Sequence, residues 1–360
     1  MPSPVSSAAH TPAPAGLALP LHTALVAAIR DGLVESVHYG SAVALSGDGS
    51  VAAAAGDPMA PFYPRSALKP LQAVAMVRAG LELPADLLAL AAASHSGAAA
   101  HRDGALRILE LHGLAPTDLD NSTDLPYGTA EREDWLRNGG SATQITHNCS
   151  GKHAAMVATC VINGWPVQGY LDPSHPLQQL VAQTVSDLTG EEPAAVSTDG
   201  CGTPLFALTL GGMARAFGRI AQAAAASLAG NDDDVSPEAA VGLAMQQHPE
   251  MVAGEGRDVT ALMRLLPGAV AKDGFEGVQL VGLADGSAVA VKISDGGDRA
   301  RMPATVRLLE ALGVDREPLA GIATAPVLGG GHQVGRLMAT DFLNPAFPNT
   351  NTSTPDNEAL

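Results

Sequence analysis

The chain has 360 residues, 46% of them hydrophobic, and carries a formal net charge of −17 at pH 7. This acidic balance makes nucleic acid or an anionic membrane surface an unfavourable partner, because both attract positively charged proteins. No apolar run is long enough for a transmembrane helix, and the first residues lack the positive charges of a signal peptide. The cysteines, Cys149, Cys160 and Cys201, are odd and few for a secreted disulfide framework, so we expect a cytoplasmic protein.

The length favours a single large domain, which we place at residues 21–343. The proline-interrupted start, 1–20, and the tail at 344–360, rich in Asn, Thr and Pro, are expected to be disordered. We find no internal repeat.

Strand and helix signals alternate along this domain. Apolar runs at 33–38 and 41–45 with a turn at 47–49 predict a hairpin, and runs at 277–284 and 287–293 predict another through Asp285-Gly286. We expect helices at 64–80, 84–114 (broken around 94–97), 151–162, 174–189, 204–228 and 298–312, and a turn-rich stretch at 115–148. Helices between hairpins at both ends predict an α/β fold of the α+β kind, with an antiparallel sheet covered by helices.

Lysine is scarce in this chain. Of 20 basic residues only four are lysine, namely Lys69, Lys152, Lys272 and Lys292. Arginine can solvate a surface equally well, but a buried lysine amine can lose its proton and a guanidinium cannot. Each lysine is therefore a candidate for chemistry, with four chance surface lysines as the alternative.

Ser66 and Lys69 form a Ser-x-x-Lys motif at the start of the predicted helix 64–80. Side chains three residues apart lie on one helix face, and the helix dipole disfavours an ammonium group in the first turn. A neutral Lys69 amine beside the Ser66 hydroxyl would be a general base beside a nucleophile. The alternative is a helix cap followed by a surface lysine.

Lys272 lies in Ala271-Lys272-Asp273-Gly274, just before the second hairpin. Serine penicillin-recognising enzymes pair a Ser-x-x-Lys helix with a Lys-Thr-Gly strand, so the match here is imperfect at Asp273. Ser94 could then be the middle serine that passes protons between the two lysines. Ser96 is the rival for that role, and an ordinary loop serine is the alternative.

A third cluster lies at 147–153, HNCSGKH. Cys149 and Lys152 are three residues apart at a helix start, and Cys201 follows in a glycine turn. Two cysteines with a nitrogen donor suit zinc, and a buried pair of free thiols is the alternative. Cys160, inside an apolar helix, is expected to be a core residue.

These motifs together resemble a known family. PRSALKP (64–70), ASHSG (93–97), HNCSGKH (147–153), DGC (199–201) and AKDG (271–274) are similar to the type II-like asparaginases of the rhizobial, thermolabile class. The resemblance covers roughly residues 22 to 315. It implies a fold like that of serine β-lactamases and serine-dependent glutaminases, with a helical subdomain packed on the sheet. It also implies hydrolysis of L-asparagine to L-aspartate and ammonia.

The resemblance also implies residue roles. The catalytic groups would be two serine–lysine pairs, Ser66 with Lys69 and Ser94 with Lys272. The metal site, usually zinc, would consist of Cys149, Lys152 and Cys201. The substrate pocket would be bordered by Arg65, His153 and Asp199. Family members often form homodimers. Asp273 stands where they often carry threonine or serine, and could bind the substrate α-ammonium group.

The expected reaction begins when neutral Lys69 takes the proton of Ser66, which attacks the side-chain amide. An aspartyl ester forms, Ser94 and Lys272 relay the proton to the leaving amine, and water releases aspartate. Glutamine or a β-lactam are alternative substrates for the same groups. A zinc-stabilised binding protein without activity is the alternative outside enzymes.

Overall fold

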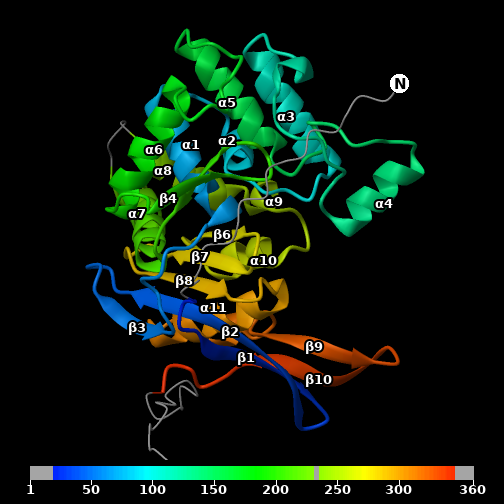
Figure 1. Cartoon of the computed structure of the whole chain (residues 1–360), viewed down its shortest axis with the longest axis vertical. Helices are drawn as coiled ribbons and strands as arrows, with labels where there is room; N and C mark the ends of the chain where they lie inside the picture. Colours follow the sequence, from blue (N-terminus) through cyan, green and yellow to red (C-terminus); the bar gives the residue numbers. More distant parts are fainter. Residues whose placement is uncertain (1–18, 231–234, 345–360) are drawn as a thin grey trace, which may run out of the picture.

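A computed structural model describes residues 19–230 and 235–344 of the chain. The predicted disordered lead and tail therefore lie outside the described residues, except for residues 19, 20 and 344. Within the described part, helices gather in the upper half of Figure 1 and a β-sheet fills the lower half.

The sheet is antiparallel, in the strand order β6-β7-β8-β2-β1-β10-β9, with β3 paired to β2. Its strands are β1 (Thr23–Arg30), β2 (Leu33–Leu45), β3 (Val51–Ala55), β6 (Val270–Gly274), β7 (Val278–Gly282), β8 (Ala288–Ile293), β9 (Thr324–Gly329) and β10 (His332–Ala339). Strands β6 and β7 are buried along their whole length, so both faces of that part of the sheet are covered. This confirms the predicted mixed fold with an antiparallel sheet and helices.

The helices pack on this sheet and on one another. They are α1 (Lys69–Arg78), α2 (Ala85–Ala91), α3 (Ala99–Leu111), α4 (Thr129–Arg137), α5 (Ser150–Ile162), α6 (Pro176–Thr189), α7 (Leu210–Ala229), α8 (Pro237–Gln247), α9 (Pro249–Val252), α10 (Asp258–Leu265) and α11 (Arg301–Ala311). Short 3-10 turns are η1 (Arg65–Leu68), η2 (Pro116–Asp118), η3 (Asp298–Ala300) and η4 (Glu317–Leu319). Helices α7 and α11 contact the sheet directly, and α1, α5, α6 and α8 pack in the helical half above it.

The hairpin between β7 and β8 follows from its turn residues. Gly286 adopts a φ of 87°, which favours glycine, and Asp285 accepts hydrogen bonds from the backbone N–H and hydroxyl of Ser287. The predicted hairpins at β2–β3 and β7–β8 are both confirmed.

One close approach joins the helical half to the sheet. A Cβ atom on Gly274, at the end of β6, would lie 2.3 Å from the carbonyl oxygen of Pro64. Only glycine lets η1 lie this close to the strand. As a result Ser66, in η1, and Lys272, in β6, come from distant parts of the sequence to neighbouring positions.

The segment between α2 and α3 is held by backbone hydrogen bonds. The N–H groups of Ser94 and Ser96 donate to the carbonyls of Val252 and Ala253, at 3.0 and 2.7 Å, and that of His95 donates to Asn148. These bonds fix the loop that carries Ser94, although no regular element contains it. The predicted break of the helix at 94–97 is thereby confirmed.

Two regions differ from the prediction. The expected helix at 204–228 is wrong at its start, where β5 (Pro204–Ala207) pairs with β4 (Ala195–Thr198) before α7 begins at Leu210. Its apolar residues are buried as a strand, and short apolar runs do not distinguish the two periodicities. The stretch 115–148, expected to be turn-rich, also contains the helix α4, whose polar composition gives no apolar face.

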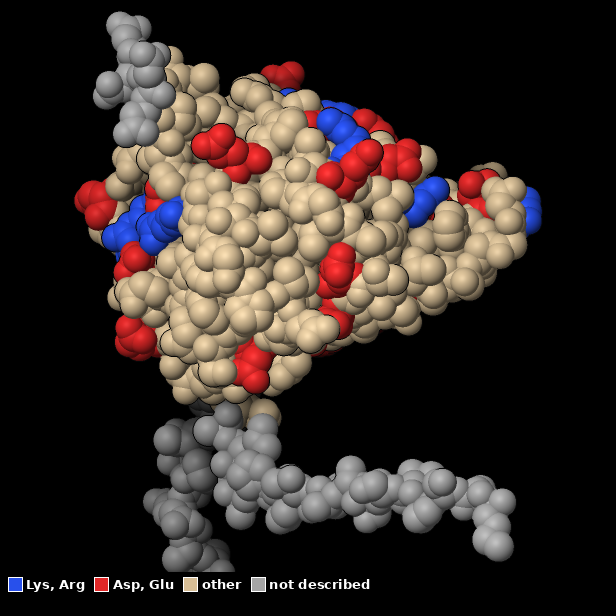
Figure 2. Space-filling view, turned by 90° about the horizontal axis from the view of Figure 1, so that it is seen from above, with Lys and Arg blue, Asp and Glu red and all other residues tan. Residues whose placement is uncertain are grey.

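The surface is sparsely charged. On the face shown in Figure 2, acidic and basic side chains are scattered over a mostly uncharged surface. Among the described helices, none is both long and apolar enough to cross a bilayer.

Candidate active site

Ser66 lies at a strained point of the backbone. It is buried in η1, and the residue before it, Arg65, has a φ of 54°. This left-handed conformation is uncommon for a residue with a side chain and costs about 1–3 kcal/mol, which the surrounding structure must offset. Such strain concentrates at functional positions. The sequence pattern contained no sign of it.

Lys69 begins α1 and is fully buried. Its Nζ donates to the carbonyl oxygen of Ala93 at 2.7 Å and to Oγ of Ser94 at 2.8 Å. Ser94 is therefore the serine that Lys69 contacts directly. Among the described residues, no carboxylate forms an ion pair with this amine.

Lys272 is also fully buried, in β6. Its Nζ donates to Oδ1 of Asp273 at 2.6 Å and to the carbonyl oxygen of the same residue at 2.9 Å. Burial lowers the pKa of Lys272 to about 8, although the Asp273 carboxylate acts in the opposite direction. A fraction of this amine is therefore neutral near physiological pH.

The four expected catalytic residues are thus brought together, but their hydrogen bonds differ from the expected pairing. Among the described residues, neither a Ser66–Lys69 nor a Ser94–Lys272 hydrogen bond is formed. The structure instead gives a Lys69–Ser94 bond and a Lys272–Asp273 ion pair. Asp273 is also held by Arg257 at 2.8 Å, so two cations engage its carboxylate.

A cavity of about 210 Å³ opens beside Ser66. It is lined by Arg65, Ser66, Ser122, Thr123, Asp124, His147, Asn148, Cys149, Asp199, Gly200, Cys201 and Phe275. Arg65 donates through Nε to Oδ1 of Asp199 at 2.7 Å, so two of the expected substrate residues form an ion pair in this cavity.

The third expected substrate residue, His153, lies elsewhere. It is fully buried, its Nδ1 shares a hydrogen bond with the Tyr170 hydroxyl at 2.8 Å, and it does not line the cavity. Burial lowers its pKa to about 4, so its ring is neutral at pH 7. His147, from the same motif, lines the cavity instead, and burial also lowers its pKa to about 4.

Cys149 and Cys201 line this cavity, Lys152 contacts Cys201, and all three residues are buried. Nζ of Lys152 lies 3.1 Å from Sγ of Cys201. A hydrogen bond from Cys149, together with the Lys152 charge, lowers the pKa of the Cys201 thiol well below its usual value. Burial alone would lower the pKa of Lys152. The sulfurs of Cys201 and Cys149 have the larger effect, so the pKa of Lys152 is raised.

The donor set fits a zinc ion in its chemistry. Two sulfur atoms and one amine nitrogen converge, and zinc prefers sulfur and nitrogen donors. Within the described ranges, no group of three or more His, Cys, Asp or Glu side chains could hold a metal ion. Lys152 is therefore the third donor that such a site would need. Cys160 is buried in the core, as predicted.

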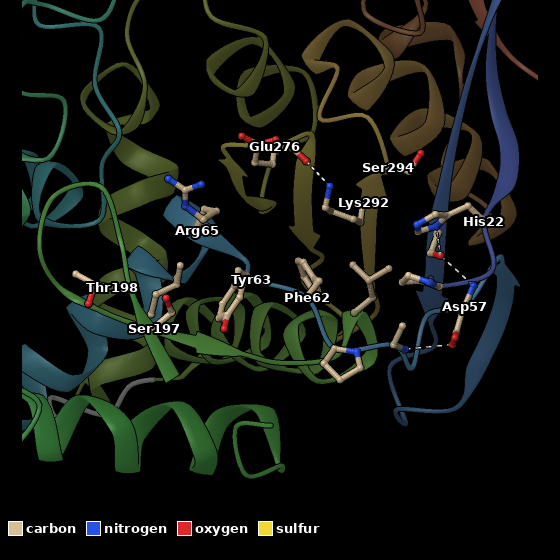
Figure 3. A pocket seen from close by; sticks show the side chains of 16 residues that line it. His22, Asp57, Phe62, Tyr63, Arg65, Ser197, Thr198, Glu276, Lys292 and Ser294 are labelled. Atoms are coloured by element: carbon tan, nitrogen blue, oxygen red, sulfur yellow. Dashed lines mark hydrogen bonds between the residues drawn. The ribbon is translucent and has the colours of Figure 1, made fainter. Parts of the chain in front are cut away.

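Arg65 also borders a larger cavity of about 520 Å³, shown in Figure 3. Lys292, the remaining lysine, extends into this cavity from β8, and its Nζ donates to the carbonyl oxygen of Glu276 at 2.6 Å. Phe62 and Tyr63 lie across from it, and His22 lies on the far side from Arg65. Lys292 is thus separate from the serine–lysine cluster.

A small third cavity, of about 10 Å³, lies between the two serines. It is lined by Ser66, Ser94, Tyr127, Asn148, Arg257, Asp273, Gly274, Phe275 and Asp298. Sequence reasoning missed Arg257 and Tyr127 because each lies in a loop without a motif, and only the fold brings them to Ser66.

Comparison with known protein families gives the class of this site. The chain is a hydrolase that acts on amide C–N bonds, an amidohydrolase of the asparaginase type. The family model of L-asparaginase II matches residues 26–339, which is most of the chain, and the chain belongs to that family. No curated protein matches the chain. The asparaginase part of the resemblance is thereby confirmed.

Proposed function

We propose that the chain hydrolyses L-asparagine to L-aspartate and ammonia, with Ser66 as the covalent nucleophile. The observation that carries this proposal is the position of Ser66. It follows a strained residue, borders a cavity of about 210 Å³, and lies in the same turn-and-helix unit as the buried Lys69. A serine with a buried amine nearby is the arrangement needed to activate a hydroxyl group.

Acylation begins with transfer of the Ser66 proton to Lys69. The Ser66 oxygen attacks the side-chain amide carbon, and backbone N–H groups, that of Ser66 among them, stabilise the oxyanion. Lys69 contacts Ser94, so Ser94 is the group that delivers the proton to the leaving nitrogen. Ammonia departs and an aspartyl ester remains on Ser66. Lys272, whose pKa burial lowers to about 8, is the second amine of this relay and takes up a proton only in its neutral form.

The Arg65–Asp199 pair supports recognition of a free amino acid. The guanidinium complements an α-carboxylate, and the Asp199 carboxylate complements an α-ammonium group. Both side chains line the cavity that Ser66 borders. A substrate bound there would present its side-chain amide toward Ser66.

Cys149, Lys152 and Cys201 are the residues that would hold zinc. When bound, the metal would fix the shape of this wall and help to orient the substrate. Lys152 would have to lose its proton to become a ligand, so binding would release protons.

The finer classification also belongs to this proposal. The five motifs support a rhizobial, thermolabile type of asparaginase with a serine β-lactamase-like fold. The antiparallel sheet with a helical half agrees with that fold. The three cysteines are free, which supports a cytoplasmic location, and the homodimer rests on the family resemblance.

The proposal is tested by a coupled ammonia assay with L-asparagine and L-glutamine, run with and without a chelator. We expect ammonia from asparagine at a kcat/KM at least about tenfold above that for glutamine. Faster release from glutamine would make the chain a glutaminase, and hydrolysis of nitrocefin alone would point to β-lactams. Binding of asparagine without any ammonia release would overturn the enzymatic proposal.

A further inference from the structure

Ser66 borders two cavities of very different size. The larger, of about 210 Å³, has room for an amino acid, and the smaller, of about 10 Å³, does not. Both are lined by Ser66, Asn148 and Phe275. A cavity needs roughly 10–15 Å³, about one probe sphere, to hold a water molecule. The size of the smaller cavity therefore fits about one water molecule.

Arg257 supplies an unused donor at this cavity. Its Nη2 donates to Oδ2 of Asp273 at 2.8 Å, and its guanidinium carbon lies 5.0 Å from the centre of the Tyr127 ring. These contacts fix the guanidinium group. Its Nη1 is buried and has no hydrogen-bond partner among the described residues. A buried donor without an acceptor costs about 1–3 kcal/mol, so a bound acceptor is expected there.

The other polar groups around the cavity complete a water site. A buried water molecule makes two to four hydrogen bonds. Ser66 and Ser94 contribute hydroxyl groups, and Asp273 contributes a carboxylate. Although burial opposes its charge, the cations Lys272, Arg301 and Arg257 lower the pKa of Asp273, so it stays ionised and can only accept a hydrogen bond.

We propose that this cavity binds the water that hydrolyses the aspartyl ester on Ser66, and that Arg257 is the residue that positions it. This inference rests on the proposed function. The water oxygen attacks the ester carbonyl carbon from the small cavity while the aspartyl group occupies the large one. One water proton passes to Ser94, and the Ser94 hydroxyl proton passes along the existing hydrogen bond to neutral Lys69. Lys69 then donates a proton to the Ser66 oxygen as the ester C–O bond breaks. The second water proton stays on the side-chain carboxyl group of the product and leaves to solvent when this group ionises. The products are therefore L-aspartate, a proton and free Ser66, and atoms and charges balance without a further reactant.

The inference separates the two half-reactions. Arg257 serves the second step only, so its loss should slow deacylation and leave acylation unchanged. When deacylation alone slows, kcat and KM fall together and kcat/KM stays constant. A residue that merely supports the fold, or one that binds the substrate, would lower kcat/KM.

The test is rapid-quench measurement of ammonia from L-asparagine with the full-length wild type, Arg257→Met and Arg257→Lys. For Arg257→Met we expect a burst of about one ammonia per active site and a steady rate roughly 100-fold lower. We expect kcat/KM within about threefold of the wild type, and an aspartyl adduct in the quenched protein. Arg257→Lys keeps the positive charge beside Asp273 and should show a smaller burst and a smaller loss.

Arg264→Met is the matched control, because Arg264 lies in the last turn of α10, the helix that Arg257 precedes, and forms an exposed ion pair with Glu255. It should behave as the wild type. Steady ammonia release without a burst in both Arg257 variants, with kcat/KM reduced as much as kcat, would overturn the water site and leave the proposed function intact. Absence of ammonia even in the first turnover of the wild type would overturn both.

Discussion

Two fully buried lysines, Lys152 and Lys272, have opposite electrostatic surroundings. The sulfurs of Cys201 and Cys149 raise the pKa of Lys152 against the effect of burial. For Lys272 burial prevails and lowers the pKa to about 8, even though Asp273 is in contact. Burial alone therefore does not decide the charge of a lysine, since the neighbours determine which effect is larger.

The site therefore consists of two clusters, to which we assign different functions. In the proposed mechanism, the amines of the serine–lysine cluster, formed by Ser66, Lys69, Ser94 and Lys272, exchange protons with its hydroxyl groups. The cysteine–lysine cluster, formed by Cys149, Lys152 and Cys201, contains a charged amine beside thiols and suits binding. We expect substitutions in the first cluster to affect the rate most, and those in the second to affect metal content and stability.

The largest effect is expected for Ser66→Ala. Removal of the nucleophile should lower the rate of ammonia release from asparagine by about 10⁴-fold or more, because no covalent intermediate can form. Ammonia assays at saturating asparagine measure the loss. Activity within tenfold of the wild type would rule out Ser66 as the nucleophile. The catalytic role assigned to the serine–lysine cluster would then be wrong.

The next effect distinguishes the two loop serines. Ser94→Ala removes the hydroxyl that Lys69 contacts and should lower kcat by about 10²- to 10³-fold. Ser96→Ala is the matched control, since the Ser96 hydroxyl is buried without a hydrogen-bond partner among the described residues. We expect the control to retain kcat within about threefold. Equal losses in both variants would show that the loop conformation matters more than the Ser94 hydroxyl.

A smaller effect is expected from pH. A lysine that takes up protons must be neutral, and the neutral form of Lys272 predominates above its pKa of about 8. The rate should therefore rise with pH by up to about tenfold per unit below pH 8 and level off above it. In Lys272→Met the pH–rate profile should lack the transition with its midpoint near pH 8. A midpoint near 10.5, the ordinary lysine value, would contradict the effect of burial on this amine.

The smallest effect on rate is expected in the cysteine–lysine cluster. Cys201→Ser should lower zinc affinity by about 100-fold or more, since one of three donors is lost. The melting temperature should fall by several degrees, with a loss of rate much smaller than that of Ser66→Ala. Metal analysis after dialysis and thermal unfolding provide the measurements, and Cys160→Ser is the control. Unchanged zinc content in Cys201→Ser would remove Cys201 from the ligand set.

Sequence patterns predicted the elements whose conformation depends mainly on neighbouring residues. Turn residues such as Asp285 and Gly286 specified a hairpin, and apolar periodicity specified α5 and α6, which the structure confirms. The strand β5 was assigned to a helix, because a run of four apolar residues is compatible with both.

The site was predictable where it consisted of motifs. Lysine scarcity drew attention to Lys69, Lys152 and Lys272, and the structure places all three in the two clusters. The direct contact of Lys69 with Ser94 depends on how hydrogen bonds tether the loop after α2 to Val252 of α9 and Ser150 of α5, which no local pattern specifies. Arg257 reaches Ser66 only through the packing of α10 against β6.

The most direct test of the division is peptide mapping of wild-type protein quenched in acid during turnover of L-asparagine. We predict an aspartyl adduct on the peptide that contains Ser66 and none on the peptides that contain Cys149 or Cys201. An adduct on either thiol would show that the nucleophile lies in the cysteine–lysine cluster and would contradict the assignment of Ser66 as the nucleophile.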